Sequence, residues 1–454
     1  MTRARLTSRS LRPAPIDPKR LLTAAAAAGC REAEVFVDRH TQTPVTFENG
    51  ELAMLEATDG FLLSLRLVSG GRVGFATTSR PDDYAVVERA VRAAAYGPPG
   101  DFSFASPDLA AGARDVPLND STLEELPTAR LVDLGQELVD ASLARDAGAN
   151  VSVRLQRWMG EMRLANSNGV DVSFRRTFLA VQMSGEIVEP DGIVRVFRGE
   201  AANRLRDLDF ARLKDDYLAD LGLARTRAPA TSGPCRVLFD PSAVPDLLLP
   251  VSAAVSGQAF ARGVSPWLGS TGRQVADPHL TLVDDATLPY GPASAPCDDE
   301  GVATRPTAIL EEGVFRGPLT DLRAAAKLGR PPSGHGYRRG GNPPGPGRSN
   351  WILAPGTIAP DRLLAELGDG VLVRLLMGSG SGNVLAGEVS GAVLIGYLAR
   401  GGELVGRLRD CLLRVNAFEV LRGRLLGLGT ERRWNLSNCL APPILVDGAD
   451  LTAR

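Results

Sequence analysis

Residues 45–56 read VTFENGELAMLE, in which two strand-like runs lie on either side of Asn49-Gly50. The dipeptide Asn-Gly readily adopts the positive φ angles of a two-residue turn, so it is the strongest short-range signal for a β-hairpin. A second hairpin is predicted downstream, where residues 61–68 and 72–76 flank the turn sequence SGG at 69–71. The chain is therefore predicted to build a sheet of antiparallel strands joined by tight turns.

The segments around these hairpins extend the sheet and add helices to it. Residues 34–37 predict a short strand, two long strands surround Asn168-Gly169, and a third lies near residues 193–198. Helix signals, such as capping residues and apolar residues on one face, occur at about 18–28, 81–96, 128–146 and 213–223. Helices beside strands that are joined by tight turns predict an α+β domain, which we assign to residues 16–224.

The second half of the chain predicts a separate, β-rich domain. Residues 225–234 read RTRAPATSGP, a composition typical of a linker. Beyond the linker, a strand at 235–239 and a helix at about 242–257 precede short strands at 280–283, 308–310, 371–376, 393–397 and 444–446. Two domains also agree with the length, because 454 residues exceed what one hydrophobic core usually supports. The C-terminal domain is predicted to span residues 235–454.

Two segments are predicted to lack fixed structure. Residues 1–15 are basic and contain proline, which predicts a disordered tail. Residues 330–349 are dominated by proline, glycine and arginine, so burial can offset little of the entropy that ordering would cost. We expect residues 330–349 to form a mobile surface loop.

Composition excludes several classes of function. The net charge of −2 offers no field to attract a phosphate backbone, so nucleic acid is not expected as a partner. No apolar run approaches the roughly 20 residues of a membrane span, so no membrane is expected either. The five cysteines are scattered without any C-x-x-C, which is typical of free thiols in a reducing compartment, and we expect a cytoplasmic protein. None of the three lysines follows a P-loop pattern, which excludes that type of nucleotide hydrolysis.

Histidines are too few and too dispersed to predict a zinc site. A catalytic zinc site generally needs about three protein ligands and an open position. The only histidines are His40, His279 and His335, and no two of them share a helical turn. Each is interpreted as a surface or hydrogen-bonding residue.

Two acidic clusters leave two interpretations open. Residues 284–285 read DD and residues 298–300 read DDE. Carboxylates held close together could perform acid/base chemistry if burial separated their pKa values. Acidic residues flanked by proline and glycine are also common in turns and helix caps, where they accept backbone hydrogen bonds.

Several short segments distributed over residues 20–450 are informative when their order and spacing are considered together. They are AGCREAEVFV (28–37), ENGEL (48–52), GRVGFA (71–76), LTLVDD (280–285), DDEGV (298–302), GE (387–388), SGA (390–392) and GGEL (401–404). In order and spacing these segments resemble the TldD/PmbA family, also called the TldD/TldE or modulator-of-gyrase peptidases. The last three depart slightly from the family pattern, which usually reads Gly-Asp, Gly-Ala and Asn-Gly-Glu. The resemblance implies a TldD/PmbA-type C-terminal domain.

The resemblance also implies a two-part assembly. The catalytic member of the family carries H-E-x-x-x-H on the first helix of its C-terminal domain, and a late cysteine completes its zinc site. Aligning Ser256-Gly257 with the end of that motif places the histidine positions on Leu248 and Ala253 and the glutamate on Leu249. Hydrocarbon side chains offer a metal no lone pair, and Cys439, which lies where the late cysteine falls, would not hold zinc alone.

The resemblance therefore predicts a non-catalytic, metal-free TldE/PmbA-like subunit. Its partner would be a TldD-like subunit that contains H-E-x-x-x-H and carries the zinc, and the pair would hydrolyse a peptide or amide bond. This chain would need no cofactor, would contribute no catalytic residue, and would help to enclose the substrate. The residues predicted to contact the substrate or the chamber are Arg262, Asp298, Asp299, Glu300 and Asn350.

Two alternatives remain at the level of the sequence. The chain could be a stand-alone binding or scaffold protein without a peptidase partner. It could also be an independent hydrolase that uses the cluster Asp298, Asp299 and Glu300.

Overall fold

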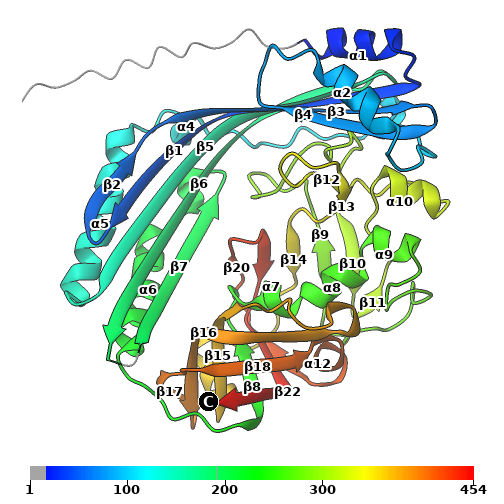
Figure 1. Cartoon of the computed structure of the whole chain (residues 1–454). Coiled ribbons are helices and arrows are strands. Elements are labelled where there is room, and N and C mark those ends of the chain that lie inside the picture. Colours follow the sequence, from blue (N-terminus) through cyan, green and yellow to red (C-terminus); the bar gives the residue numbers. More distant parts are fainter. Residues whose placement is uncertain (1–16, 191, 454) are drawn as a thin grey trace, which may run out of the picture.

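The chain folds into a long curved sheet that arches over a β-rich C-terminal part (Figure 1). The computed structural model describes residues 17–190 and 192–453, so the predicted tail at 1–15 lies outside the described residues. The architecture is α+β, as predicted.

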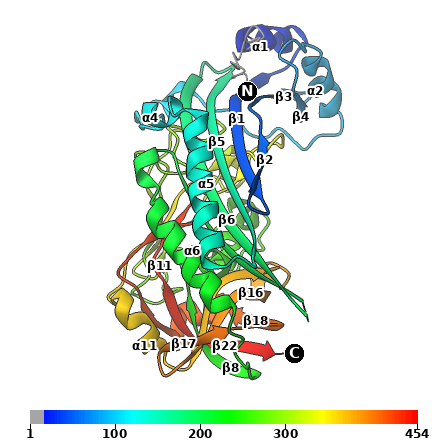
Figure 2. The same cartoon turned by 90° about the vertical axis from the view of Figure 1, so that its left-hand side faces the viewer.

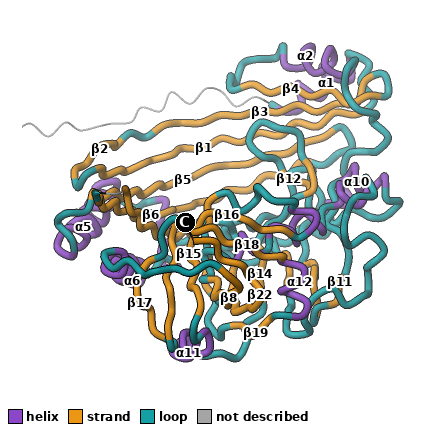
Figure 3. The backbone as a smooth tube through the Cα atoms, turned by 60° about the horizontal axis from the view of Figure 1, so that its bottom comes forward, coloured by secondary structure: helices purple, strands orange, loops and turns teal. Residues whose placement is uncertain are grey.

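The arch is an antiparallel sheet of seven strands in the order β4-β3-β1-β5-β6-β7, with β2 paired to β1. Its strands are β1 (Glu32–Glu48), β2 (Glu51–Leu55), β3 (Thr58–Ser69), β4 (Arg72–Thr78), β5 (Asn150–Asn166), β6 (Asp171–Glu189) and β7 (Gly192–Ala202). Every pair of neighbours is antiparallel. Figure 3 shows β1, β3 and β5 running side by side along the length of the arch.

The predicted hairpin turns are confirmed, whereas one strand is longer than predicted. Asn49 and Gly50 have φ angles of 52° and 83°, as a turn with positive φ at both positions requires. Residues 34–37 and 45–48 are parts of one 17-residue strand, β1, and are not two short strands. Polar residues between these two runs interrupt the apolar pattern, but they continue the pairing with β5.

Helices cover the outer face of the arch at its two ends. They are α1 (Pro18–Ala27), α2 (Val86–Ala94), α4 (Ser121–Glu124), α5 (Thr128–Arg145), the 3-10 turn η1 (Leu205–Asp207) and α6 (Phe210–Ala224). The short helix α3 (Pro107–Ala110) packs on the opposite face, toward the C-terminal part. The pair α1 and α2 packs on one end of the sheet, and α5 and α6 pack on the other (Figure 2). The helix predicted from residue 81 begins only at Val86, because Pro81 lies in a separate turn.

The C-terminal part is built around a closed ring of strands, to which two further strands are added. The ring consists of β8 (Gly233–Phe239), β15 (Gly370–Met377), β16 (Glu388–Arg400), β18 (Cys411–Asn416) and β22 (Ile444–Ala453), whereas β17 (Glu403–Arg407) pairs with β16 and β19 (Leu425–Leu428) pairs with β22. The order is β15-β8-β22-β18-β16-β17, and β15 also pairs with β16, which closes a barrel. The predicted C-terminal β-rich domain is confirmed in its fold class.

A second sheet stands beside the barrel in the order β11-β10-β9-β14-β21-β20. Its strands are β9 (Leu282–Asp284), β10 (Thr307–Glu311), β11 (Val314–Phe315), β14 (Trp351–Leu353), β20 (Arg433–Trp434) and β21 (Cys439–Ala441). A separate ribbon pairs β12 (Gly336–Tyr337) with β13 (Gly345–Pro346). The remaining helical segments are α10 (Leu322–Lys327), η2 (Pro360–Arg362), α11 (Leu363–Leu367), η3 (Val384–Ala386) and α12 (Ala417–Gly423).

The helix predicted over residues 242–257 is broken into three short helices. They are α7 (Val244–Leu247), α8 (Leu249–Ala254) and α9 (Gly257–Ala261). Pro245 and Pro250 lie in the first turns of α7 and α8. Proline has no N–H to continue a helix across these positions, so each one restarts it. This segment positions the residues that the sequence aligned with the zinc motif.

The predicted linker at 225–234 makes contacts with the barrel. Arg227 forms a parallel bridge to Arg407, and the backbone N–H of Ala228 donates to the Arg407 carbonyl at 2.9 Å. Residues 233 and 234 already belong to β8. Within the described residues, no helix is both long and apolar enough to cross a bilayer.

Candidate functional site

A cavity of about 470 Å³ lies beside α8, where the sequence places the former metal motif. Its wall consists of Leu249, Ser252, Ala253, Val255, Ser256, Gln258, Leu319, Tyr337, Arg339, Asn342, Pro343, Gly345, Pro346, Gly347, Arg348 and Trp351. These residues come from α8, α9 and the turn between them, from Leu319 before α10, and from the segment 337–351. A larger cavity, of about 620 Å³, lies between β7, β16 and β18 and includes none of the motif positions. We therefore take the cavity beside α8 as the candidate site.

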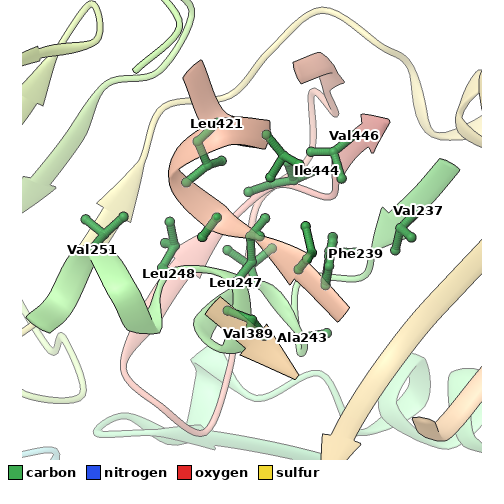
Figure 4. Close-up of a cluster of buried hydrophobic side chains, with 14 of the residues drawn as sticks. Val237, Phe239, Ala243, Leu247, Leu248, Val251, Val389, Leu421, Ile444 and Val446 are labelled. Atoms are coloured by element: carbon green, nitrogen blue, oxygen red, sulfur yellow. The ribbon is translucent and has the colours of Figure 1, made fainter. Parts of the chain in front are cut away.

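The three motif positions do not share one environment. Leu248 is 2% exposed and packs into the hydrophobic core near Leu247 and Val251 (Figure 4). Leu249 and Ala253 line the cavity. None of the three side chains carries an atom that can donate an electron pair to a metal.

Cys439 does not supply the missing ligands. It lies on β21 and pairs with Trp351 of the cavity wall. Burial raises the pKa of its thiol to about 11, although the nearby charge of Arg348 acts in the opposite direction. Across residues 17–190 and 192–453, no three His, Cys, Asp or Glu side chains are grouped so that they could hold a metal ion. The residues present at the motif positions do not fit a zinc ion.

The prediction of a mobile surface loop at residues 330–349 is wrong for the centre of this segment. His335 is 2% exposed, and Gly336 and Tyr337 form the ribbon strand β12. The N–H of Gly336 donates to Asp298 at 2.8 Å, and the Arg338 guanidinium donates to Glu34 at 2.5 Å. The segment is held in place because its N–H and guanidinium groups donate to carboxylates that lie far away in the sequence. Residues 339–343 remain exposed on the far side of the ribbon.

The acidic cluster at 298–300 holds turns together and does not line the cavity. One oxygen of Asp298 accepts hydrogen bonds from the N–H groups of Glu300 and Val302, both at 3.0 Å. Asp299 accepts from the N–H of Arg338 at 2.7 Å. Burial raises the pKa values of Asp298 and Asp299, and the charge of Glu300 adds to the rise at Asp298.

Glu300 belongs to a buried ion cluster, which we define as Glu34, Arg66, Glu300 and Arg338. Arg66 donates to Glu300 at 2.7 Å and to Glu34 at 3.0 Å, and its guanidinium lies 4.6 Å from the centre of the Phe104 ring. Glu300 also accepts from the N–H of Leu322 at 2.7 Å. The cluster joins β1 and β3 of the arch to the C-terminal part, and its carboxylates are occupied by these contacts.

Three family models match consecutive parts of the chain. The PmbA/TldA metallopeptidase domain 1 matches residues 33–96, the central domain matches 121–225, and the C-terminal domain matches 232–453. The chain belongs to the PmbA/TldD metallopeptidase family.

Individual relatives agree over nearly the whole length. TldE from Thermococcus kodakarensis has a TM-score of 0.86 at 22% identity, with 96% of this chain and 100% of that chain covered. Metalloprotease PmbA of Escherichia coli O157:H7 is 25% identical over 92% of both chains. A Metalloprotease TldD homolog of Haemophilus influenzae is 26% identical over only 38% of this chain and 36% of its own length.

Two other residues that the sequence assigned to the chamber lie away from the cavity wall of this family member. Asn350 is fully buried, where its amide donates to the Asp285 carbonyl and to Ser294, both at 2.8 Å, and its oxygen accepts from Ala293. Arg262 is exposed at the end of α9. Their assignment to substrate contacts stays a prediction.

The three histidines lie on separate elements. His40 is part of β1, 3.0 Å from Asp38, and its ring lies 5.4 Å from that of Trp158. His279 is exposed and lies 2.7 Å from Asp277. Of the two roles expected for it, surface or hydrogen-bonding, His335 has the second, because its buried ring contacts Ser333 at 2.9 Å through Nδ1 and Asp284 at 3.2 Å through Nε2.

Asp284 also binds Ser349, but the three residues do not form a hydrolytic triad. The hydroxyl and the N–H of Ser349 both donate to Asp284, and His335 contacts the same carboxylate. In a triad the serine hydroxyl bonds to the histidine, which removes its proton. This buried group fixes the start of β14.

Sequence reasoning missed the polar residues of the cavity wall, namely Tyr337, Arg339, Arg348 and Trp351. A signal was present, because residues 330–349 contain four arginines and no acidic residue. Arginines without nearby acids predict a binding surface for an anion more readily than an inert loop.

Proposed function

We propose that this chain is the metal-free, TldE/PmbA-like subunit of a two-subunit zinc peptidase. Its partner is a TldD-like subunit that contains H-E-x-x-x-H and holds the zinc. The pair hydrolyses a peptide or amide bond in the cytoplasm, a location supported by the five free cysteines. This chain completes the substrate chamber.

The observation that carries the proposal is the chemistry of the cavity beside α8. A family of metallopeptidases needs electron-pair donors and a carboxylate at such a site, whereas this member presents Leu249 and Ala253. A PmbA metalloprotease matches over 92% of both chains, whereas a TldD homolog matches over 38% of this chain. This difference supports a PmbA-like subunit over a TldD-like one. We therefore expect this cavity wall to bind the peptide without cleaving it.

The independent-hydrolase alternative has less support. The carboxylates of Asp298, Asp299 and Glu300 are engaged by backbone N–H groups or by Arg66, and none of them lines the cavity. A general base must reach the proton that it removes, directly or through one water molecule.

The proposal is tested by purifying the chain alone and together with a TldD-like subunit, followed by metal analysis and a peptidase assay. We expect the pair to contain zinc and to cleave peptides, and the chain alone to do neither. The control is a partner whose two motif histidines are replaced by alanine, which should still bind this chain without zinc or activity. Stoichiometric zinc in the isolated chain would overturn the proposal.

Two further outcomes point to the alternatives. Failure to bind any TldD-like subunit would favour a stand-alone binding or scaffold protein. Hydrolysis by the isolated chain in excess chelator would favour the acidic cluster. Asp299→Asn and Glu300→Gln would then test that site.

A further inference from the structure

The cavity beside α8 is lined by cations without acids. Arg339 and Arg348 are part of its wall, and no Asp or Glu is among the lining residues. Within the described part of the chain, neither guanidinium has a carboxylate oxygen inside the 4.0 Å range of an ion pair. By contrast, the buried arginines Arg66 and Arg198 each pair with carboxylates.

Arg348 is the more enclosed of the two. Its guanidinium lies 5.0 Å from the centre of the Trp351 ring, and burial lowers its pKa. A buried cation is costly unless a partner of opposite charge or several acceptors compensate for lost hydration. A bound anion would supply this compensation at the place where the chain itself does not.

A hydrogen-bond donor on the same wall is also unused. Within the described residues, the indole N–H of Trp351, a residue that is 1% exposed, has no acceptor. The amides of Gln258 and Asn342 complete the polar side of the cavity. Buried polar groups in native proteins nearly always have a partner, so an unpaired donor on a cavity wall indicates an acceptor that enters from outside.

We propose that this cavity binds a carboxylate group of a peptide, with Arg348 and Arg339 as its cationic clamp. The planar guanidinium matches a carboxylate through two parallel hydrogen bonds. Leu249 and Ala253 offer an apolar surface to the adjoining part of the peptide, and the cavity volume lies within the usual range for ligand sites. The inference rests on the proposed function for the peptide nature of the ligand and adds which group this chain holds.

The test is calorimetric titration of the full chain with three short peptides. They are N-acetylated tetra-alanine with a free C-terminus, the same peptide as its C-terminal amide, and an N-acetylated Ala-Glu-Ala amide. We expect at least one carboxylate-bearing peptide to bind about tenfold or more tightly than the neutral amide. A preference for the first or the third distinguishes a terminal carboxylate from an acidic side chain. Equal binding of all three, or no binding of any, overturns the inference.

Variants identify the clamp. Arg348→Gln and Arg339→Gln should each weaken binding by about tenfold or more. Arg339 is exposed, so its variant remains informative if Arg348→Gln fails to fold, which melting curves would reveal. Arg323→Gln on the surface of α10 removes the same charge outside the cavity and should leave binding unchanged. If Arg323→Gln weakens binding as much as the clamp variants do, the effect is one of net charge and the inference fails.

The outcome of this binding experiment can be told apart from the outcome of the zinc analysis. Binding uses the chain alone and requires neither zinc nor a partner. If the isolated chain binds no peptide but the pair contains zinc, only the inference of a carboxylate site fails. If the chain binds the carboxylate peptides but no TldD-like partner, only the proposed subunit role fails.

Discussion

Arginine is used in this molecule in two different ways. In the buried ion cluster, Arg66 joins two carboxylates from distant segments, a task that its rigid, always charged fork performs well. In the cavity, Arg348 has the aromatic face of Trp351 beside it, and among the described residues no carboxylate lies within ion-pair distance of its guanidinium. The same residue type is therefore structural where carboxylates surround it and available for a ligand where they are absent.

Asp321 provides a test of burial at the scale of one residue. Its side chain accepts from the N–H of Ala324 at 2.7 Å, capping α10, and it is 5% exposed. Burial, followed by the charge of Glu300, raises its pKa to about 6. Because this pKa lies above the value of about 3.9 in an unfolded chain, the folded state holds the proton more tightly. The resulting stabilisation is present below about pH 4 and is lost as the pH rises through about 6.

Asp321→Asn should remove this pH dependence, because asparagine keeps the oxygen that caps the helix but does not ionise. Relative to the unmodified chain, we expect the free energy of unfolding of the variant to increase by roughly 1–3 kcal/mol between pH 4.5 and 7.5. Urea unfolding of both proteins at both pH values measures the difference. An equal difference at the two pH values, or one of opposite sign, would contradict the assignment.

At the scale of elements, turns were predictable and strand lengths were not. The pair Asn49-Gly50 and the glycines at 70 and 71 demand positive φ angles, a local property that the sequence displays directly. The length of β1 depends on β5, which lies more than a hundred residues away and supplies hydrogen bonds to the polar middle of the strand. Such pairing overrides a local pattern that lacks apolar alternation.

The candidate site was predictable only in part, for a related reason. That Leu249 and Ala253 occupy the positions of the family's zinc motif is a prediction from the resemblance, and the structure places both residues on the cavity wall. The fixed centre of residues 330–349 could not be predicted, because it depends on Arg338 reaching Glu34 from 304 positions away. Proline- and glycine-rich composition predicts high ordering entropy, but it carries no information about a distant carboxylate.

Gly74 tests how closely a helix packs on a strand. It lies on β4 beneath α2, and a Cβ atom built on it would lie 2.0 Å from the carbonyl oxygen of Ala90. Backbone atoms cannot rotate away as a flexible side chain can, so α2 would have to shift. We expect Gly74→Ala to reduce the free energy of unfolding by about 1–3 kcal/mol in urea titration. Gly423→Ala is the matched control, since no atom lies within 4 Å of its added Cβ. Equal effects of the two substitutions would show that α2 tolerates the displacement.

At the scale of the whole molecule, several ion pairs join the arch to the C-terminal part, including Arg407 with Glu189 of β6 and Arg433 with Asp216 of α6. Two of the contacts involve fully buried carboxylates. One is the ion cluster, where Arg338 contacts Glu34 of β1. At the other, Arg374 of β15 and Arg198 of β7 both contact Asp220 of α6, the latter at 2.7 Å. Ionic contacts at separate places resist both sliding and hinging of the arch. This rigidity suits a wall that must keep a substrate chamber in shape.

The last prediction concerns cooperativity between the arch and the C-terminal part. The double variant Arg338→Met, Arg374→Met removes one of the two arginines that contact Glu34 and one of the two that contact Asp220, which weakens the interface more than either core. We expect calorimetry to record one unfolding transition for the unmodified chain and two for the variant, because parts that lose their coupling unfold separately. The control, Arg92→Met with Arg362→Met, breaks one exposed pair in each part and should keep a single transition. A single transition in the double variant would mean that the contacts that remain, among them the pair of Arg407 with Glu189, are enough to couple the two parts.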